Sequence, residues 1–370
     1  MIEFGISTSS FQYEEECKNS HLYDENKIGN YHKKHWKDDL TLVKNLGVKY
    51  YRFSIEWSQI QPKEDKWEVS ELQRYDKYID FLIKNEITPV LCLFHFSCPK
   101  WFMDKGGFLK VPEKFYSFAK QCIQYFKKKV KYFITYNEPN VYATCCYMIG
   151  RWKPFKNNIF TFKKCIRNMT TVHNEIVETF KKNQNIKIGV IVNIIPSIVE
   201  TFLNSVFQDL WNDCFFKKMT DKTDFIGINY YFSRHVQWSD VFRYKEKDFF
   251  KKNRNNTDSN LGWPICPQHI ANAVEHVHIK YPDMNIWITE NGLSTQKPYA
   301  QSDFIENHVK VLQEKCPYIQ KYFYWTLIDC FEWDYGTKAK FGLVGYDRNF
   351  NRKPKPSYYA YQKLILKLQS

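Results

Sequence analysis

Two glutamates, Glu138 and Glu290, each follow a short apolar run and come directly before a residue that breaks regular structure. Pro139 follows the first glutamate, and Asn291-Gly292 follows the second. Such a run is typical of a strand that leads into a turn, so both carboxylates are predicted at strand ends. Two carboxylates that flank one bond are what the hydrolysis of a glycosidic bond requires. Either glutamate alone is more simply interpreted as a solvated loop residue, but the pair favours this chemistry.

Two strand ends so far apart in the sequence can face each other only in a sheet that closes on itself. Short β-prone runs alternate with longer amphipathic patterns along the whole chain. The predicted strands are residues 2–8, 50–55, 88–94, 132–135, 187–194, 225–229, 285–289 and 322–325. This alternation predicts an α/β fold, a single (β/α)8 TIM barrel that forms one catalytic domain over residues 1–370.

The predicted helices carry apolar residues at a helical period. The first, residues 36–46, has Asp38 and Asp39 in its first turn, where acids interact favourably with the helix dipole, and Gly47 as its stop. The other predicted helices are residues 69–84, 112–128, 162–182, 267–280, 302–314 and 357–368. A doubly wound open sheet is the alternative, but no glycine-rich phosphate loop follows any predicted strand.

Polar and aromatic side chains follow most of the predicted strands at their carboxyl ends. In a (β/α)8 barrel the chemistry lies at this end of the strands. The candidates there, besides the two glutamates, are Gln12, Arg52, His95, Asn137, Asn229, Tyr231, Trp325, Glu332 and Trp333. The fifth predicted strand adds no candidate that can be identified.

The composition allows a large core and gives no sign of a nucleic-acid partner. The chain has 370 residues, of which 44% are hydrophobic and 18% aromatic, and sugar-binding clefts use aromatic faces as platforms. The formal charge of +14 is compatible with an anionic partner. The lysines, however, alternate with acids and aromatics and accompany no nucleic-acid motif, so most are interpreted as solvated helix faces.

The cysteines and the N-terminal sequence favour a reducing compartment. The eleven cysteines form no CxxC pair, and Met1 leads directly into a strand-like segment without the features of a signal peptide. No apolar run approaches the ~20 residues needed to cross a bilayer. The expected location is therefore cytoplasmic, with no membrane partner. Residues 245–260 are predicted to form a mobile surface loop near the rim.

Several stretches, taken in order, resemble glycoside hydrolase family 1, the β-glucosidase and β-galactosidase type, over nearly the whole chain. They are residues 9–14 (SSFQYE), 51–57 (YRFSIEW), 93–96 (LFHF), 135–139 (TYNEP), 224–231 (DFIGINYY), 288–292 (ITENG), 325–333 (WTLIDCFEW) and 341–343 (FGL). The resemblance implies a cofactor-free and metal-free enzyme that hydrolyses small β-glycosides. It leaves the oligomeric state open.

The resemblance also implies roles for the candidate residues in a retaining mechanism. Glu290 would be the nucleophile and Glu138 the acid/base. Arg52, Asn137, Asn229 and Tyr231 would support them, with Asn137 at the sugar 2-hydroxyl. Gln12, His95, Trp325, Glu332, Trp333 and Phe341 would bind the non-reducing sugar. The structural alternatives are an interior ion-pair partner for Arg52, a core histidine for His95, and core aromatics for Trp325 and Trp333.

The chain departs from the family pattern at Glu15, Phe96, Cys98, Cys330 and Lys340, none of which is a catalytic position. It is also a shortened member, with segments missing between residues 16 and 32, between 196 and 224, and before 302. Shortened rim segments predict an open leaving-group side with broad aglycone tolerance. Two alternatives stay open: a degenerate carbohydrate-binding barrel and a 6-phospho-β-glycosidase, the latter disfavoured by the acid Glu332.

Overall fold

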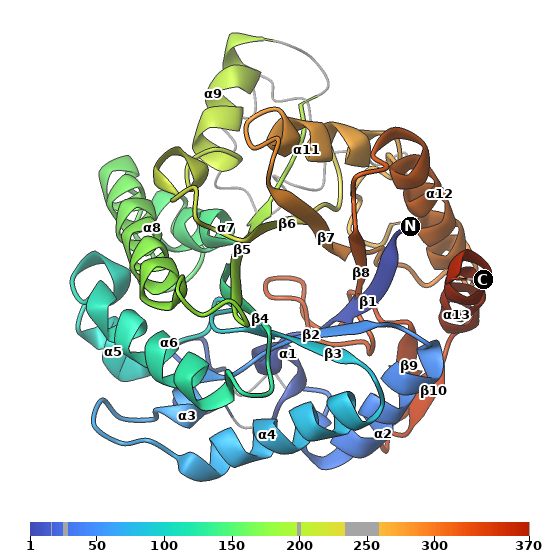
Figure 1. The fold of residues 1–370 in the computed structure, drawn as a ribbon, viewed down its shortest axis with the longest axis horizontal. Coiled ribbons are helices and arrows are strands. Elements are labelled where there is room, and N and C mark those ends of the chain that lie inside the picture. The colour runs from blue at the N-terminus through green and yellow to red at the C-terminus, as the bar shows by residue number, and fades with distance from the viewer. Residues whose placement is uncertain (16, 25–28, 198–200, 234–258, 370) are drawn as a thin grey trace.

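The computed structural model describes residues 1–15, 17–24, 29–197, 201–233 and 259–369. Eight parallel strands close into a barrel, in which each strand pairs with its sequence neighbours and β8 returns to β1 (Figure 1). The strands are β1 (Glu3–Ser7), β2 (Tyr50–Ser54), β3 (Thr88–Cys92), β4 (Tyr132–Asn137), β5 (Lys187–Asn193), β6 (Phe225–Asn229), β7 (Asn285–Asn291) and β8 (Lys321–Trp325). The predicted (β/α)8 barrel is confirmed.

Helices surround the barrel on its outside (Figure 1). The longer ones are α2 (His32–Leu46), α4 (Val69–Lys84), α6 (Pro112–Phe126), α8 (Ile159–Phe180), α9 (Phe202–Trp211), α11 (His269–His278), α12 (Ala300–Lys315) and α13 (Pro356–Gln369). Short helices follow several strands: α1 (Ser10–Tyr13), α3 (Trp57–Ile60), α5 (Lys100–Asp104) and α7 (Pro139–Ala143). Helix α6 shows why these segments fold: Pro112 begins it, and Phe115, Phe118, Cys122 and Phe126 bury one face.

The barrel interior is filled by side chains at the amino-terminal end of the strands, and so it is a packed core and not a pore. This inner cluster contains Tyr50, Val90, Cys92, Ile134, Ile191, Phe225, Trp287 and Phe323. Lys321 closes it, with its ammonium 4.8 Å from the ring centroid of Tyr50 and 4.7 Å from that of Trp287. Because both faces of the strands are covered, the strands are almost wholly apolar until they reach their carboxyl ends.

Register shifts interrupt the sheet beside both glutamates. The pairing of β6 with β7 shifts between Ile228 and Asn229, so that Asn229 lies opposite Glu290, and a second shift follows Ile134 in β4. Successive strand residues point to opposite faces, so a shift of one residue moves the next side chain to the other face. Strict alternation from Trp287, which packs inside the barrel, would turn Glu290 outward. The shift allows Glu290 to face inward.

One helix start was predicted wrongly. Helix α2 begins at His32 and not at residue 36, so Asp39 lies in its interior and not in its first turn. Asp39 is fully buried and accepts hydrogen bonds from Arg352 (2.6 Å) and His32 (2.7 Å). The Asp39 carboxylate therefore forms an ion pair that holds the carboxyl-terminal region against α2. It does not act on the dipole of the helix from the first turn.

Other boundaries differ less, and one hairpin was missed. The remaining predicted helix ends lie within three residues of those observed. Two short antiparallel strands, β9 (Val344–Tyr346) and β10 (Arg352–Pro354), were not predicted. Of the predicted rim loop at residues 245–260, all but Ser259 and Asn260 lie outside the described residues.

Candidate active site

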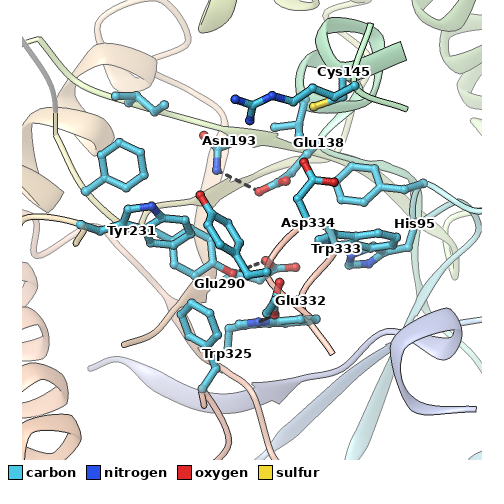
Figure 2. Close-up of a pocket in the computed structure, with 18 of the residues that line it drawn as sticks. His95, Glu138, Cys145, Asn193, Tyr231, Glu290, Trp325, Glu332, Trp333 and Asp334 are labelled. Atoms are coloured by element: carbon cyan, nitrogen blue, oxygen red, sulfur yellow. Dashed lines mark hydrogen bonds between the residues drawn. The ribbon is translucent and has the colours of Figure 1, made fainter. Parts of the chain in front are cut away.

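An open cavity of about 870 Å³ lies at the carboxyl ends of the strands. Figure 2 shows both glutamates projecting into it, from opposite sides of the barrel mouth. Eight of the residues predicted from the sequence line this cavity: His95, Glu138, Tyr231, Glu290, Trp325, Glu332, Trp333 and Phe341. The other four predicted residues, Gln12, Arg52, Asn137 and Asn229, are fully buried: Arg52, Asn137 and Asn229 contact lining residues from behind, and Gln12 contacts the carbonyl of Phe331.

Strand β7 delivers Glu290, whose carboxylate is held by a cation and a phenol. The Arg52 guanidinium donates to its Oε1, and the Tyr231 hydroxyl donates to its Oε2 at 2.6 Å. Burial, followed by the charge of Glu290, raises the pKa of Tyr231 well above its usual range, so this phenol keeps its proton. Both oxygens of Glu290 therefore accept hydrogen bonds, an arrangement that favours the ionised carboxylate.

The turn after Glu290 requires glycine. A Cβ added at Gly292 would lie 2.0 Å from the backbone oxygen of Trp325, much closer than any real contact. The Asn291 amide on the same turn donates to the Tyr230 carbonyl at 2.8 Å. The Asn-Gly pair thus lets β7 end against β8 and fixes the direction of the preceding carboxylate.

Glu138 stands in a different environment, at the start of α7. Its backbone is left-handed, with φ of 47°, and Pro139 occupies the first helical position behind it. Burial, together with the charge of Glu290, raises the pKa of Glu138 to about 8. Two amides, of Asn229 at 2.8 Å and of Asn193 at 3.0 Å, donate to its Oε1. With a pKa of about 8, this carboxyl is mostly protonated at neutral pH.

A buried network joins the two glutamates beneath the cavity. The Asn137 side-chain oxygen accepts from Arg52 at 2.8 Å and from Asn229 at 3.0 Å. Its amide nitrogen lies 3.2 Å from Nε2 of His95. Burial, and then the charge of Arg52, lowers the pKa of His95 well below its usual range, so this ring is neutral. The network is fixed before any substrate arrives.

The β8 side of the cavity presents Trp325, Glu332 and Trp333. The Trp325 indole donates to Oε1 of Glu332 at 2.9 Å, and burial raises the pKa of Glu332 to about 8. The rings of Trp325 and Trp333 both lie near that of His95 and nearly parallel to it, with centroid distances of 5.9 and 6.2 Å. Gln12 donates to the carbonyl of Phe331 at 2.9 Å and so lies directly behind this wall.

The structure adds several site residues that no sequence pattern had indicated. Asn193, at the end of β5, is a site residue on the fifth strand, where the sequence offered no identifiable candidate; its amide contacts Glu138 (Figure 2). The only sequence signal is a single asparagine after an apolar run. The outer cavity wall also contains Arg151, Trp152, Trp211, Phe232 and Trp263, which come from loops and helix ends without recognisable motifs.

The departures from the family pattern lie beside the site. The Cys330 sulfur is 3.8 Å from the amide nitrogen of Gln12. The Cys98 sulfur is 3.2 Å from Nδ1 of His21, outside the cavity lining. Phe96 lines the cavity with a left-handed backbone, φ 65°, and packs edge-on against Trp333. Among the described residues, none of these three makes a hydrogen bond to Glu138 or Glu290.

Comparison with known proteins identifies the family. The sequence model of Glycosyl hydrolase family 1 matches residues 5–206 and 211–369. The chain belongs to this family. As a family 1 member it is a glycoside hydrolase of the β-glycosidase type, and glycosides are the substrates that fit it.

Individual relatives of this family 1 chain are distant but extensive. It is 27% identical to Beta-glucosidase A of Thermotoga maritima over 90% of this chain and 86% of that protein. It is 28% identical to the Furostanol glycoside 26-O-beta-glucosidase of Hellenia speciosa, covering 90% and 73% of the two chains. Among solved structures, the beta-glycosidase from Pyrococcus horikoshii superposes with a TM-score of 0.88 at 28% identity, covering 98% and 93%.

The described part of this family 1 chain contains no helix that is both long and apolar enough to span a bilayer. All eleven cysteines are free thiols, and nine of them are buried.

Proposed function

We propose that this family 1 member is a retaining β-glycosidase. It removes the terminal non-reducing β-D-glucosyl residue, or a related β-glycosyl residue, from small glycosides. Glu290 is the nucleophile and Glu138 the acid/base. The observation that carries the assignment is the contrast between the two carboxyls: Glu290 accepts from a cation and a phenol, whereas burial and the facing charge keep the proton on Glu138.

In the first step a Glu290 oxygen attacks the anomeric carbon while the glycosidic C–O bond breaks. Glu138 transfers its proton to the departing oxygen, which leaves as an alcohol, and the sugar stays bound to Glu290 as an ester. In the second step the Glu138 carboxylate takes a proton from water, whose oxygen attacks the anomeric carbon and releases Glu290. The sugar leaves with its original β configuration, and no cofactor or metal takes part.

The remaining residues hold the sugar so that it reacts. Asn137 contacts the 2-hydroxyl, where hydrogen bonds strengthen in the transition state. Trp325 lies under the apolar face of the ring. Gln12, His95, Glu332 and Trp333 bind the other hydroxyls, and Phe341 packs beside Tyr231, with ring centroids 5.9 Å apart.

The test is to trap the covalent intermediate. A 2-deoxy-2-fluoro β-glucoside with a dinitrophenyl leaving group should inactivate the protein, because the fluorine slows both steps while the activated leaving group spares the first. Intact-protein mass spectrometry should show one added fluoroglucosyl group, and peptide mapping should place it on Glu290. Glu290→Gln should take up no label and lose turnover.

The alternative of a degenerate carbohydrate-binding barrel gives a different result in the same experiment. A binding protein would take up the sugar reversibly and show neither release of dinitrophenol nor a covalent adduct. An adduct on another carboxylate, with Glu290→Gln still active, would contradict the assignment of the nucleophile and leave the family membership intact.

A further inference from the structure

Asn193 lies at the carboxyl end of β5 and joins α9 to the carboxyl group of Glu138. Its Nδ2 donates to Oε1 of Glu138 at 3.0 Å, and its Oδ1 accepts from the indole Nε1 of Trp211 at 3.3 Å (Figure 2). An indole N–H can only donate. The side-chain atom that meets it must therefore be the amide oxygen, which turns the NH2 group of Asn193 toward Glu138.

The backbone of this segment is held as firmly as the side chain. The side chain of Asn140, on α7 two residues after Glu138, donates to the carbonyl of Asn193 at 2.8 Å and to the carbonyl of Trp211 at 3.1 Å. The end of β5 and the end of α9 are thus tied to the helix that Glu138 begins. The Asn193 side chain cannot turn away without breaking its two hydrogen bonds, to Glu138 and to Trp211.

Asn193 is one of two amides on the same oxygen. The Asn229 amide also donates to Oε1 of Glu138, at 2.8 Å, and its own oxygen accepts from Thr289 at 2.8 Å, which fixes its orientation too. With two donors on Oε1, a proton on that oxygen would collide with them, so the proton of Glu138 belongs on Oε2. Among the described residues no donor contacts Oε2 of Glu138.

We propose that Asn193, oriented by Trp211, is a positioning residue for the general acid: with Asn229 it occupies Oε1 and leaves the acidic proton on Oε2, facing the bond to be broken. This rests on the proposed function, because it assumes that Glu138 is the acid. It also makes the end of α9 part of the catalytic machinery. Neither residue touches the reacting atoms in this role.

The proposal predicts the direction in which the acidity of Glu138 changes. An amide donor stabilises the ionised carboxylate and so lowers the pKa of Glu138, against burial and the charge of Glu290, which raise it. Loss of the Asn193 donor should therefore raise this pKa. Among the described residues, the titratable or charged groups that influence Glu138 or share its cavity are Glu290, Arg52, Tyr231, Glu332, Cys145, His95, Arg151, Asp334 and Tyr335.

The test compares pH profiles of kcat/KM for the wild type, Asn193→Ala and Trp211→Phe. With an alkyl β-glycoside, which needs protonation, the wild type should lose activity as pH rises through the pKa of the acid. Asn193→Ala should move this basic limb upward by about one pH unit, the order expected for one hydrogen bond to a charged group. Trp211→Phe keeps an aromatic ring but removes the indole N–H that donates to Asn193. It should move the basic limb in the same direction by less.

A dinitrophenyl glycoside separates the acid from Glu332, whose pKa is also raised to about 8. This leaving group needs no proton, so a limb due to Glu138 should vanish with it, whereas a limb due to Glu332 should persist. Asn193→Ala should lose roughly tenfold more kcat/KM on the alkyl than on the dinitrophenyl substrate, since general acid help is worth about 10² to 10⁴-fold in all.

Asn212→Ala is the matched control, because it removes a neighbouring buried amide that bonds to the backbone of Ile195 and does not contact Glu138. It should lower the melting temperature without moving the limb. An unmoved limb in Asn193→Ala, or in Trp211→Phe if the first variant does not fold, would overturn the proposal. Absence of turnover in the wild type would instead overturn the proposed function.

Discussion

At the scale of single residues, the site separates two identical side chains by their surroundings. The carboxylate of Glu290 accepts hydrogen bonds from Arg52 and Tyr231, whereas among the described residues Glu138 accepts only from neutral amides. Burial and the facing charge raise the pKa of Glu138 to about 8. Proximity of two carboxyls makes simultaneous ionisation costly, so the one with the cation keeps the charge. The difference between the two carboxyls therefore arises from residues at the barrel mouth.

Glu138→Ala should separate substrates by their leaving groups. The variant lacks the proton donor, so alkyl β-glycosides should lose about 10² to 10⁴-fold in kcat/KM, while dinitrophenyl glycosides should keep most of the first step. Steady-state kinetics on both substrates measures the contrast. Azide should restore part of the rate, because it attacks the glycosyl-enzyme without needing a base. Equal losses on both substrates would show that Glu138 supports the fold and not the proton transfer.

Glu332 was predicted to disfavour a 6-phosphate, and its burial changes the physical reason for that prediction. A carboxylate at this position would repel a 6-phosphate, but burial raises the pKa of Glu332 to about 8, so near neutrality it is mostly a neutral acid. The discrimination then depends on where the cations lie. Lys340 points to the ring of Tyr346, at 5.7 Å, and neither it nor Lys338 lines the cavity. Among the described lining residues Arg151, on the outer wall, is the one lysine or arginine, so neither lysine offers a partner to a phosphate with a charge near −2.

The unphosphorylated substrate should therefore turn over faster. In paired kinetics, p-nitrophenyl β-glucoside should exceed its 6-phosphate by at least about tenfold in kcat/KM at pH 7. The preference should widen above pH 8, since Glu332 then ionises and its charge adds repulsion. Glu332→Gln keeps the shape and cannot ionise, so it should lose the widening. Faster turnover of the phosphate ester would favour the 6-phospho-β-glycosidase alternative.

At the scale of elements, the sequence predicted the eight strands and most helices because each repeats a local period: apolar runs of strand length, then amphipathic helices. It could not predict the register shifts in β4 and β7, which depend on pairing with the neighbouring strand. The shift between β6 and β7 turns Glu290 into the cavity. The motif that surrounds Glu290 therefore located the carboxyl correctly, whereas local periodicity alone would have turned it outward.

The same limit explains which site residues were missed. Asn193 belongs to the site because β5 ends between β4 and β6 in the closed barrel, a tertiary fact that a lone asparagine does not signal. Trp152 and Trp211 come from loops and helix ends whose path depends on packing. Asp39 was misassigned for a related reason: its partner Arg352 lies near the other end of the chain.

At the scale of the whole molecule, aromatic side chains from the short rim form the outer wall of the cavity. Trp152 follows α7, Trp211 ends α9 and Trp263 precedes α11, and all three line the outer cavity although no sequence motif unites them. The Trp263 ring lies 5.1 Å from that of Phe232 and 6.1 Å from that of Tyr335. The shortened segments predicted a broad tolerance of aglycones. These rings add a preference to that prediction, because flat aromatic leaving groups can stack on them.

Aryl leaving groups should therefore be preferred over alkyl ones of equal acidity. Contact with one or two rings contributes about 0.5–1.5 kcal/mol each, which corresponds to roughly tenfold in kcat/KM. The measurement compares a phenyl glycoside with a fluorinated alkyl glycoside whose leaving group has the same pKa, so that chemistry is matched and only binding differs. Trp263→Ala should lower the ratio, and Phe160→Ala, which removes a ring on α8 that is 77% exposed and outside the cavity, should not. A ratio near one in the wild type would mean that the aromatic wall does not reach the aglycone, and tolerance would then extend to alkyl groups as the shortened rim alone implies.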